Sequence, residues 1–149
     1  MIKINKDYKS VTCVKNKIEF QKIVKERTTG NGIIDLSDIY FENDRSFEEM
    51  DFQFLTNESK IINVTGWNTS MFTETKYMFC NCPNLEQIIG LDTWDISNIF
   101  NMVNMFSLCP ELEDLDGIMK WKLSKGCMTN NIFKGSPKIP DDIRKMFIK

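Results

Sequence analysis

Residues 94–112, WDISNIFNMVNMFSLCPEL, indicate the fold of this chain, because several residue types in this stretch recur at a fixed interval along the sequence. Trp94 lies 27 residues after Trp67 and 27 residues before Trp121. The same step relates Ser70, Ser97 and Ser124; Phe79, Phe106 and Phe133; Pro83, Pro110 and Pro137; Cys82, Cys109 and Ser136; and Leu85, Leu112 and Ile139. A repeat of this length is typical of solenoids, in which each unit packs only against its neighbours.

Each full repeat predicts a short strand followed by a helix. In the copy that begins at Leu85, the apolar run around Ile88 predicts the strand. After the tryptophan, Ser97 is a suitable N-cap, and the next apolar residues have helical spacing: Ile99, Met102, Val103, Met105 and Phe106. The predicted fold class is therefore an α/β (α+β) solenoid, a leucine-rich-repeat-like stack of strand-helix units.

We expect one domain over residues 1–149, with an N-terminal cap at 1–32, a degenerate repeat at 33–60, repeats at 61–139 and a C-terminal cap at 140–149. Residues 1–14 predict a strand or a hairpin. Asn16 and Glu19 have the spacing of a capping box and predict a helix that ends near Gly30 and Gly32. The segment after Pro140 predicts a short capping helix.

In the degenerate repeat, counting back by 27 residues places Ile34 with Ile61. The same count places Tyr40 with Trp67 and Phe52 with Phe79. We expect these residues to occupy the corresponding positions of a first, atypical unit, because terminal repeats of a stack commonly diverge.

The block from Trp94 to Leu112 resembles the BspA-like leucine-rich repeat (the DUF285-type surface-protein repeat), usually written W-D-T-S-N-V … M-F-x-x-C-x-x-L-x-x-L. The resemblance covers about residues 65–140, although the third copy has Ser136 in place of the cysteine and Lys122-Leu123 after its tryptophan. It implies a leucine-rich-repeat-like fold and a binding role, and it implies no catalytic residues.

The residue content argues against catalysis. The chain has no histidine, which is the commonest general base and zinc ligand, and it has no nucleotide-binding or hydrolase motif. Cys80 and Cys82 form a C-x-C pair without a completing histidine, so we interpret the cysteines as structural. We expect no enzyme activity, no cofactor and no metal. No secretory signal or apolar span is visible, which predicts a cytoplasmic location.

Charge is distributed unevenly, with +5 over residues 1–29, −13 over residues 30–119 and +6 over residues 120–149. An acidic field attracts basic partners. We therefore predict a non-enzymatic protein-binding module that docks an acidic face on a basic, nucleic-acid-handling protein. The predicted partner-binding residues are Asp44, Glu48, Glu49, Asp51, Glu86, Asp92, Asp95, Glu111, Glu113, Asp114 and Asp116.

The size and charge would suit a small phage inhibitor of a host nuclease, of the anti-CRISPR kind. The lack of alanine and the wealth of Lys, Ile and Asn suggest an AT-rich coding sequence, as in many phages. Two alternatives remain open. The basic ends could bind nucleic acid directly, or the chain could be a fragment of a surface adhesin, in keeping with the family that it resembles.

Overall fold

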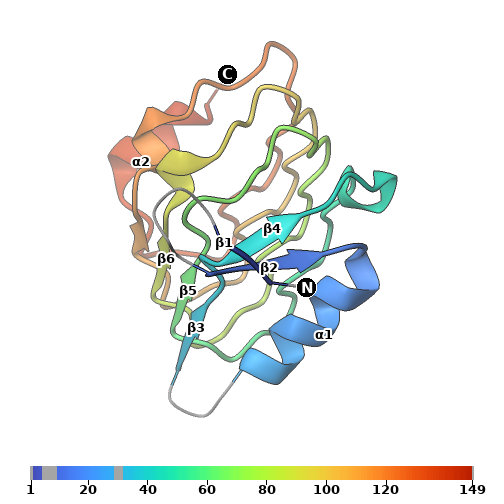
Figure 1. Ribbon diagram of the computed structural model, residues 1–149. Helices are drawn as coiled ribbons and strands as arrows, with labels where there is room; N and C mark the ends of the chain where they lie inside the picture. The colour runs from blue at the N-terminus through green and yellow to red at the C-terminus, as the bar shows by residue number, and fades with distance from the viewer. Residues whose placement is uncertain (1, 5–9, 29–31, 149) are drawn as a thin grey trace.

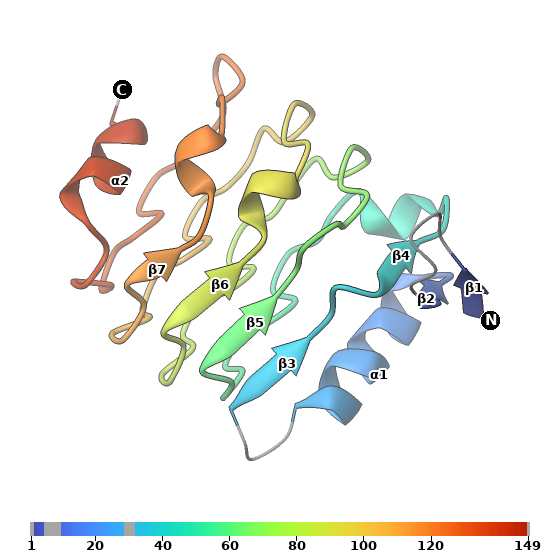
Figure 2. The ribbon, with the colours of Figure 1, turned by 60° about the vertical axis from the view of Figure 1, so that its left-hand side comes forward.

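The computed structural model describes residues 2–4, 10–28 and 32–148 and contains two sheets (Figure 1). The strands of the first sheet are, in order, β1 (Ile2–Ile4), β2 (Ser10–Val14) and β4 (Ile39–Phe41). The second sheet is parallel throughout, in the order β3 (Ile33–Asp35), β5 (Ile61–Asn63), β6 (Gln87–Ile89) and β7 (Asp114–Leu115). Helix α1 (Lys17–Arg27) lies at one end of the row of strands and α2 (Asp141–Met146) at the other (Figure 2).

Between one strand of the parallel sheet and the next, the chain makes a coil that lies against the preceding one (Figure 2). Ile62 pairs with Ile34 on one side and with Ile88 on the other, and Ile88 pairs with Leu115. These four side chains are buried. Away from the sheet, further parallel bridges join Glu49 to Glu74, Glu74 to Asn101 and Asn101 to Met128. We infer that this part of the chain is a short solenoid of coils in register.

Two rows of aromatic rings run through the interior along the stack. The Trp94 ring stacks on Trp67 at 5.6 Å and on Trp121 at 6.1 Å between ring centroids. A second row contains Phe54, Phe79, Phe106 and Phe133, at successive centroid distances of 4.9, 5.6 and 5.8 Å. Each indole N–H also donates to a backbone carbonyl oxygen of the preceding coil, that of Leu36, Val64 or Leu91. Ring stacking and buried hydrogen bonds therefore fix the same register.

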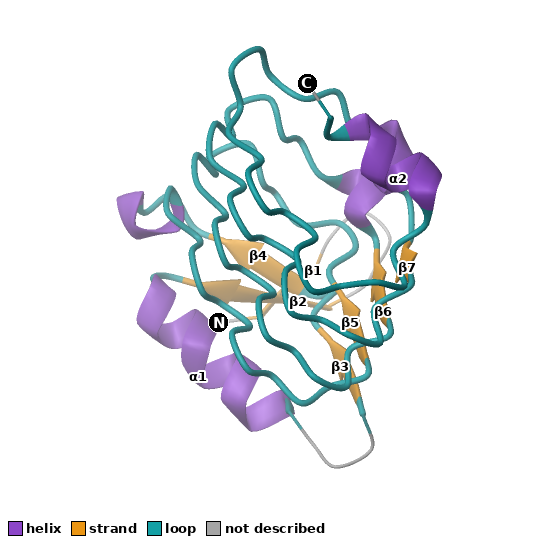
Figure 3. Cartoon of the chain, turned by 180° about the vertical axis from the view of Figure 1, so that it is seen from behind, coloured by secondary structure: helices purple, strands orange, loops and turns teal. Residues whose placement is uncertain are grey.

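The prediction of a helix over residues 97–106 is wrong. This side of each coil is irregular (Figure 3), and α1 and α2 are the α-helices in the described part of the chain. Alternate N–H groups instead donate to the next coil: those of Met102, Asn104, Phe106 and Leu108 donate to the carbonyl oxygens of Met128, Asn130, Ile132 and Lys134. We call the corresponding segment on this irregular side of each coil a ladder segment. The ladder segments are residues 50–56, 75–81, 102–108 and 129–135. The units are strand-turn units and not strand-helix units.

The recurring cysteine is a hydrogen-bond donor between coils. The Cys82 thiol donates to the Phe54 carbonyl oxygen and the Cys109 thiol to the Phe79 carbonyl oxygen, each at 3.0 Å. In the next coil the Ser136 hydroxyl donates to the Phe106 carbonyl oxygen at 2.7 Å, so serine replaces cysteine without loss of the contact. The adjacent Cys109 and burial raise the pKa of Cys82, which keeps it a thiol.

Three positions in the degenerate repeat differ from the prediction. Phe54, and not Phe52, enters the phenylalanine row, whereas Phe52 stacks on Tyr77 at the surface. Ile62, and not Ile61, is in register with Ile34.

At the tryptophan row, Tyr40 is exposed, and the adjacent Phe41 packs edge-on against Trp67 at 4.9 Å. The first two coils are not 27 residues long, since the paired residues are 28 and then 26 apart. Counting by a fixed period therefore selects a residue close to the one that occupies the repeat position.

Helix α1 and α2 close the ends of the stack. The Asn16 side chain accepts from the Glu19 N–H at 2.9 Å, so the helix begins where the sequence predicts. It ends at Arg27, earlier than the glycines, of which Gly30 lies outside the described residues. At the other end, Phe147 packs edge-on against Phe133 at 5.2 Å.

An ion pair ties α1 to the loop before β4. Arg27 contacts Asp38 through two hydrogen bonds, at 2.5 and 2.9 Å, and the Thr12 hydroxyl donates to the same carboxylate at 2.6 Å. Burial alone would raise the pKa of Asp38, but the hydrogen bonds from Arg27 and Thr12 outweigh it and hold the pKa below the usual value.

Asp38→Asn is expected to lower the free energy of unfolding by about 1–2 kcal/mol at pH 7. A lowered pKa stabilises the fold above the ordinary aspartate pKa of about 3.9, and this stability is lost as pH falls through the folded-state pKa. Urea unfolding at pH 7 and near pH 3 should therefore show a smaller difference between wild type and variant at the lower pH. Glu26→Gln, at an exposed pair, is the control. A difference independent of pH would contradict the assignment.

Candidate interaction surface

The outer face of the parallel sheet is a continuous, solvent-accessible surface. In β3, β5 and β6 the central residue points into the core and its neighbours point outward, and in β7 Leu115 points into the core. The outward positions are Ile33, Asp35, Ile61, Asn63, Gln87, Ile89, Asp114 and Asp116. Because the strands pair in register, these side chains form rows along the stack and are held by the backbone of a packed sheet.

Carboxylates are the main charged groups on this face and at the start of its strands. Glu86 and Glu113 directly precede β6 and β7, and the Glu113 N–H donates to the Glu86 carbonyl oxygen at 3.1 Å. Lys60 precedes β5 in the same row, since its carbonyl oxygen accepts from the Glu86 N–H at 2.8 Å. We call the following exposed residues the acidic sheet face: Asp35, Glu86, Glu113, Asp114 and Asp116. Among the described residues, Lys60 is the one cation in these rows.

The structure thus brings together four of the predicted site residues, Glu86, Glu113, Asp114 and Asp116. Sequence reasoning missed Asp35, which shares a row with Asn63 because both follow the buried isoleucine of their strands. Glu111 lies shortly before β7, and its carboxylate accepts a hydrogen bond from the Lys138 ammonium group at 2.6 Å. That hydrogen bond raises the pKa of Lys138, and the pairing offsets the charge of Glu111.

Asp92 and Asp95 lie at a different place, on the corner beside Trp94. Asp92 is 3.5 Å from the Lys120 ammonium group. Asp95 accepts hydrogen bonds from the backbone and hydroxyl of Ser97, which lower the pKa of Asp95. Each of these two carboxylates has a local partner, as does Asp114 on the sheet face, which accepts from the Gln87 side chain at 2.9 Å.

The predicted residues of the first coil form a third group, around the short 3₁₀ helix η1 (Arg45–Phe47) that follows β4. Asp44 caps this helix by accepting from the Ser46 N–H, and the Ser46 side chain and N–H together lower the pKa of Asp44. Glu48 is 3.7 Å from Arg45.

Glu49 and Asp51 continue this group along the bridged side of the coil, away from the parallel sheet. Burial raises the pKa of Asp51, which is 3.8 Å from Lys76. The eleven predicted residues therefore form three separate groups and not one face.

No metal-binding arrangement of three or more His, Cys, Asp or Glu side chains occurs within residues 2–4, 10–28 and 32–148. The helices in those ranges are all too short or too polar to cross a membrane. A hollow of about 850 Å³ lies at the C-terminal end of the stack and is lined by Phe133, Arg144 and Phe147 among others. Apart from Pro110, its lining residues belong to the last coil and the C-terminal cap.

Comparison with known proteins identifies the family. The family model described as "Mycoplasma protein of unknown function, DUF285" matches residues 45–149. This match covers more than half of the chain, so the chain belongs to the DUF285 family. It extends beyond the block recognised in the sequence, into the first coil and through α2. No curated protein and no solved structure matches the chain.

Proposed function

We propose that this chain is a non-enzymatic protein-binding module that docks its acidic sheet face on a basic surface of a partner protein. The observation that carries the proposal is the set of five exposed carboxylates around a parallel sheet, with Lys60 in their rows and Lys138, paired with Glu111, near Glu86 and Glu113. Each coil is held to the next by backbone hydrogen bonds and stacked rings, so little order has to be gained on binding. Carboxylates in such an array accelerate encounter with a basic partner.

We further propose that the repeats are of the BspA-like leucine-rich type, and that the partner handles nucleic acid. Proteins of that class carry large basic surfaces, which an acidic face complements. The chain would then act in the cytoplasm as an inhibitor or adaptor, and a phage-borne inhibitor of the anti-CRISPR kind is the most specific version of the idea. A role as a surface recognition module uses the same face with a different partner.

Direct binding of nucleic acid has less support. Helix α1 and the basic C-terminal coil lie at opposite ends of the stack (Figure 2), so their cations do not form one patch. Several of these cations already have partners: Arg27 contacts Asp38, Lys120 contacts Asp92 and Lys138 contacts Glu111.

Capture of the partner by the immobilised chain, followed by affinity measurements on the purified pair, tests the proposal. We expect the dissociation constant to rise about tenfold or more when salt is raised from about 50 to about 500 mM, because exposed charges are screened. An affinity that does not change with salt would contradict docking through the acidic sheet face. A gel shift with single- and double-stranded nucleic acid distinguishes the alternative.

A further inference from the structure

The last ladder segment, residues 129–135, lacks the partner that the earlier segments have. In the first three ladder segments, alternate N–H groups donate to carbonyl oxygens of the following coil. The corresponding donors of the last segment are the N–H groups of Thr129, Asn131, Phe133 and Gly135. Within the described residues, none of these four N–H groups has a hydrogen-bond acceptor. Unpaired donors in a row form an open edge that favours pairing with another chain.

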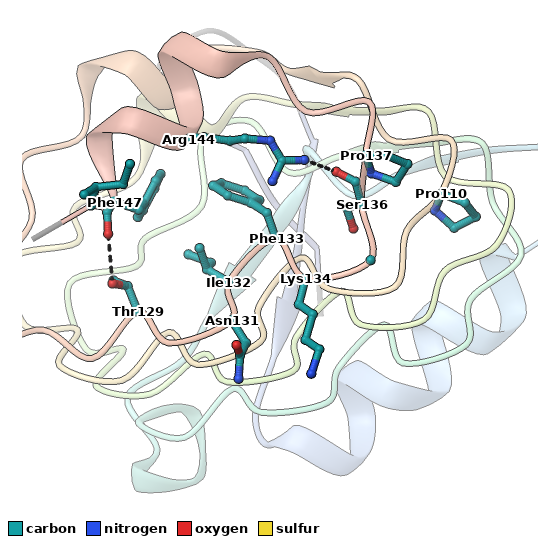
Figure 4. Close-up of a pocket in the computed structure, with 12 residues that line it drawn as sticks. Pro110, Thr129, Asn131, Ile132, Phe133, Lys134, Ser136, Pro137, Arg144 and Phe147 are labelled. Atoms are coloured by element: carbon teal, nitrogen blue, oxygen red, sulfur yellow. Dashed lines mark hydrogen bonds between the residues drawn. The ribbon is translucent and has the colours of Figure 1, made fainter.

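A hollow lies beside this open edge (Figure 4). Its volume is about 850 Å³, and Arg144 and Phe147 of the C-terminal cap line one side of it. Arg144 donates to the carbonyl oxygens of Ser136 and Ile139, and its guanidinium group lies 5.9 Å from the centre of the Phe133 ring. The cap thus covers the Phe133 ring, while Asn131, Lys134 and Gly135 remain exposed.

At the opposite end of the stack, the complementary edge is already covered. The first ladder segment presents carbonyl oxygens there, and α1 supplies donors to them. The Lys17 ammonium group donates to the Glu49 carbonyl oxygen at 2.7 Å, and the Gln21 side chain donates to Gln53. A second copy of this chain cannot add its first coil to the open edge unless α1 moves away.

We propose that the open edge binds an extended segment of a partner protein, whose backbone carbonyl oxygens accept from these N–H groups. Strand addition of this kind derives affinity from the main chain and selectivity from side chains. The cations beside the edge, Lys134 and Arg144, select acidic side chains, and the hollow accommodates an apolar one. This surface lies apart from the acidic sheet face and selects the opposite charge, so it goes beyond the function proposed above.

A synthetic peptide with the sequence of residues 48–57, EEMDFQFLTN, is the probe. In the fold this sequence presents the carbonyl edge of the first coil, and it carries three carboxylates and apolar residues. We expect titration of the ¹⁵N-labelled full chain to shift the amide signals of Asn131, Phe133 and Gly135 saturably and to slow their hydrogen exchange.

Lys134→Glu should weaken peptide binding about threefold or more, since it reverses a charge at the edge. Lys125→Glu, an equally exposed charge reversal away from the hollow, should leave binding within about twofold. Three results would overturn the proposal: amides of the last ladder segment that do not respond, equal weakening by both variants, or protection of the same amides by self-association of the free chain.

Discussion

Trp94→Ala is expected to lower the free energy of unfolding by about 4 kcal/mol, enough to leave the chain marginally folded. Trp94 is 6% exposed and stacks on a tryptophan ring on each side, so its loss leaves a cavity between two coils. The substitution also removes the N–H donor to the Val64 carbonyl oxygen, which remains buried without this partner. Urea unfolding followed by circular dichroism measures the change.

Phe100→Ala is the matched control, because Phe100 is an aromatic residue of the same coil but is 48% exposed. We expect that substitution to cost less than about 1 kcal/mol. Similar losses for the two variants would show that the tryptophan row does not hold the coils together.

Gly90→Ala is expected to cost about 3 kcal/mol or more, for two reasons. Gly90 has a φ of +97°, which disfavours any side chain. An added Cβ would also lie 2.3 Å from the hydroxyl oxygen and 2.4 Å from the Cα atom of Thr65, in the preceding coil. The Thr65 N–H donates to the Asn63 side chain at 3.1 Å, and the adjacent Val64 N–H donates to the Ile89 carbonyl oxygen at 2.9 Å, so the coils would have to separate.

Gly66→Ala isolates the first reason, the backbone conformation. Gly66 has a φ of +79°, but an added Cβ would have no atom within 4 Å. We expect this control to cost about 1 kcal/mol, from the backbone conformation alone. Thermal or urea unfolding of both variants gives the difference, which measures how closely the coils pack. A Gly66 variant as unstable as the Gly90 variant would contradict close packing at Gly90.

The 27-residue period was sufficient to predict the tryptophan row and most of the phenylalanine row, because the rings of these later coils recur at that spacing. It could not distinguish a helix from a ladder segment. Ile99, Met102, Met105 and Phe106 have helical spacing and are all buried, yet alternate N–H groups of this segment donate to the next coil, which a continuous α-helix would not allow. One usable signal is the recurrence of Asn104 as Asn131, since both adopt the left-handed conformation that asparagine tolerates.

The site was predictable only in part, because a net charge per segment does not say which carboxylates share a face. Glu86 and Glu113 are repeat-equivalent and do lie in one row. Asp44 and Asp51 have the same charge but lie on the first coil away from the parallel sheet, where Ser46 and Lys76 contact them. The open edge had no sequence signal, since unpaired N–H groups are a property of the stack.

The central claim is that the acidic sheet face meets the partner. The most direct test is to compare two charge-reversed triple variants in binding to the captured partner. Glu86→Lys, Glu113→Lys and Asp114→Lys together change the sheet face, and Asp44→Lys, Glu48→Lys and Glu49→Lys together make the same change in charge on the first coil. We predict that the first triple weakens binding about tenfold or more and that the second leaves it within about threefold. Equal weakening by both triples, or full binding by the first, would contradict the claim.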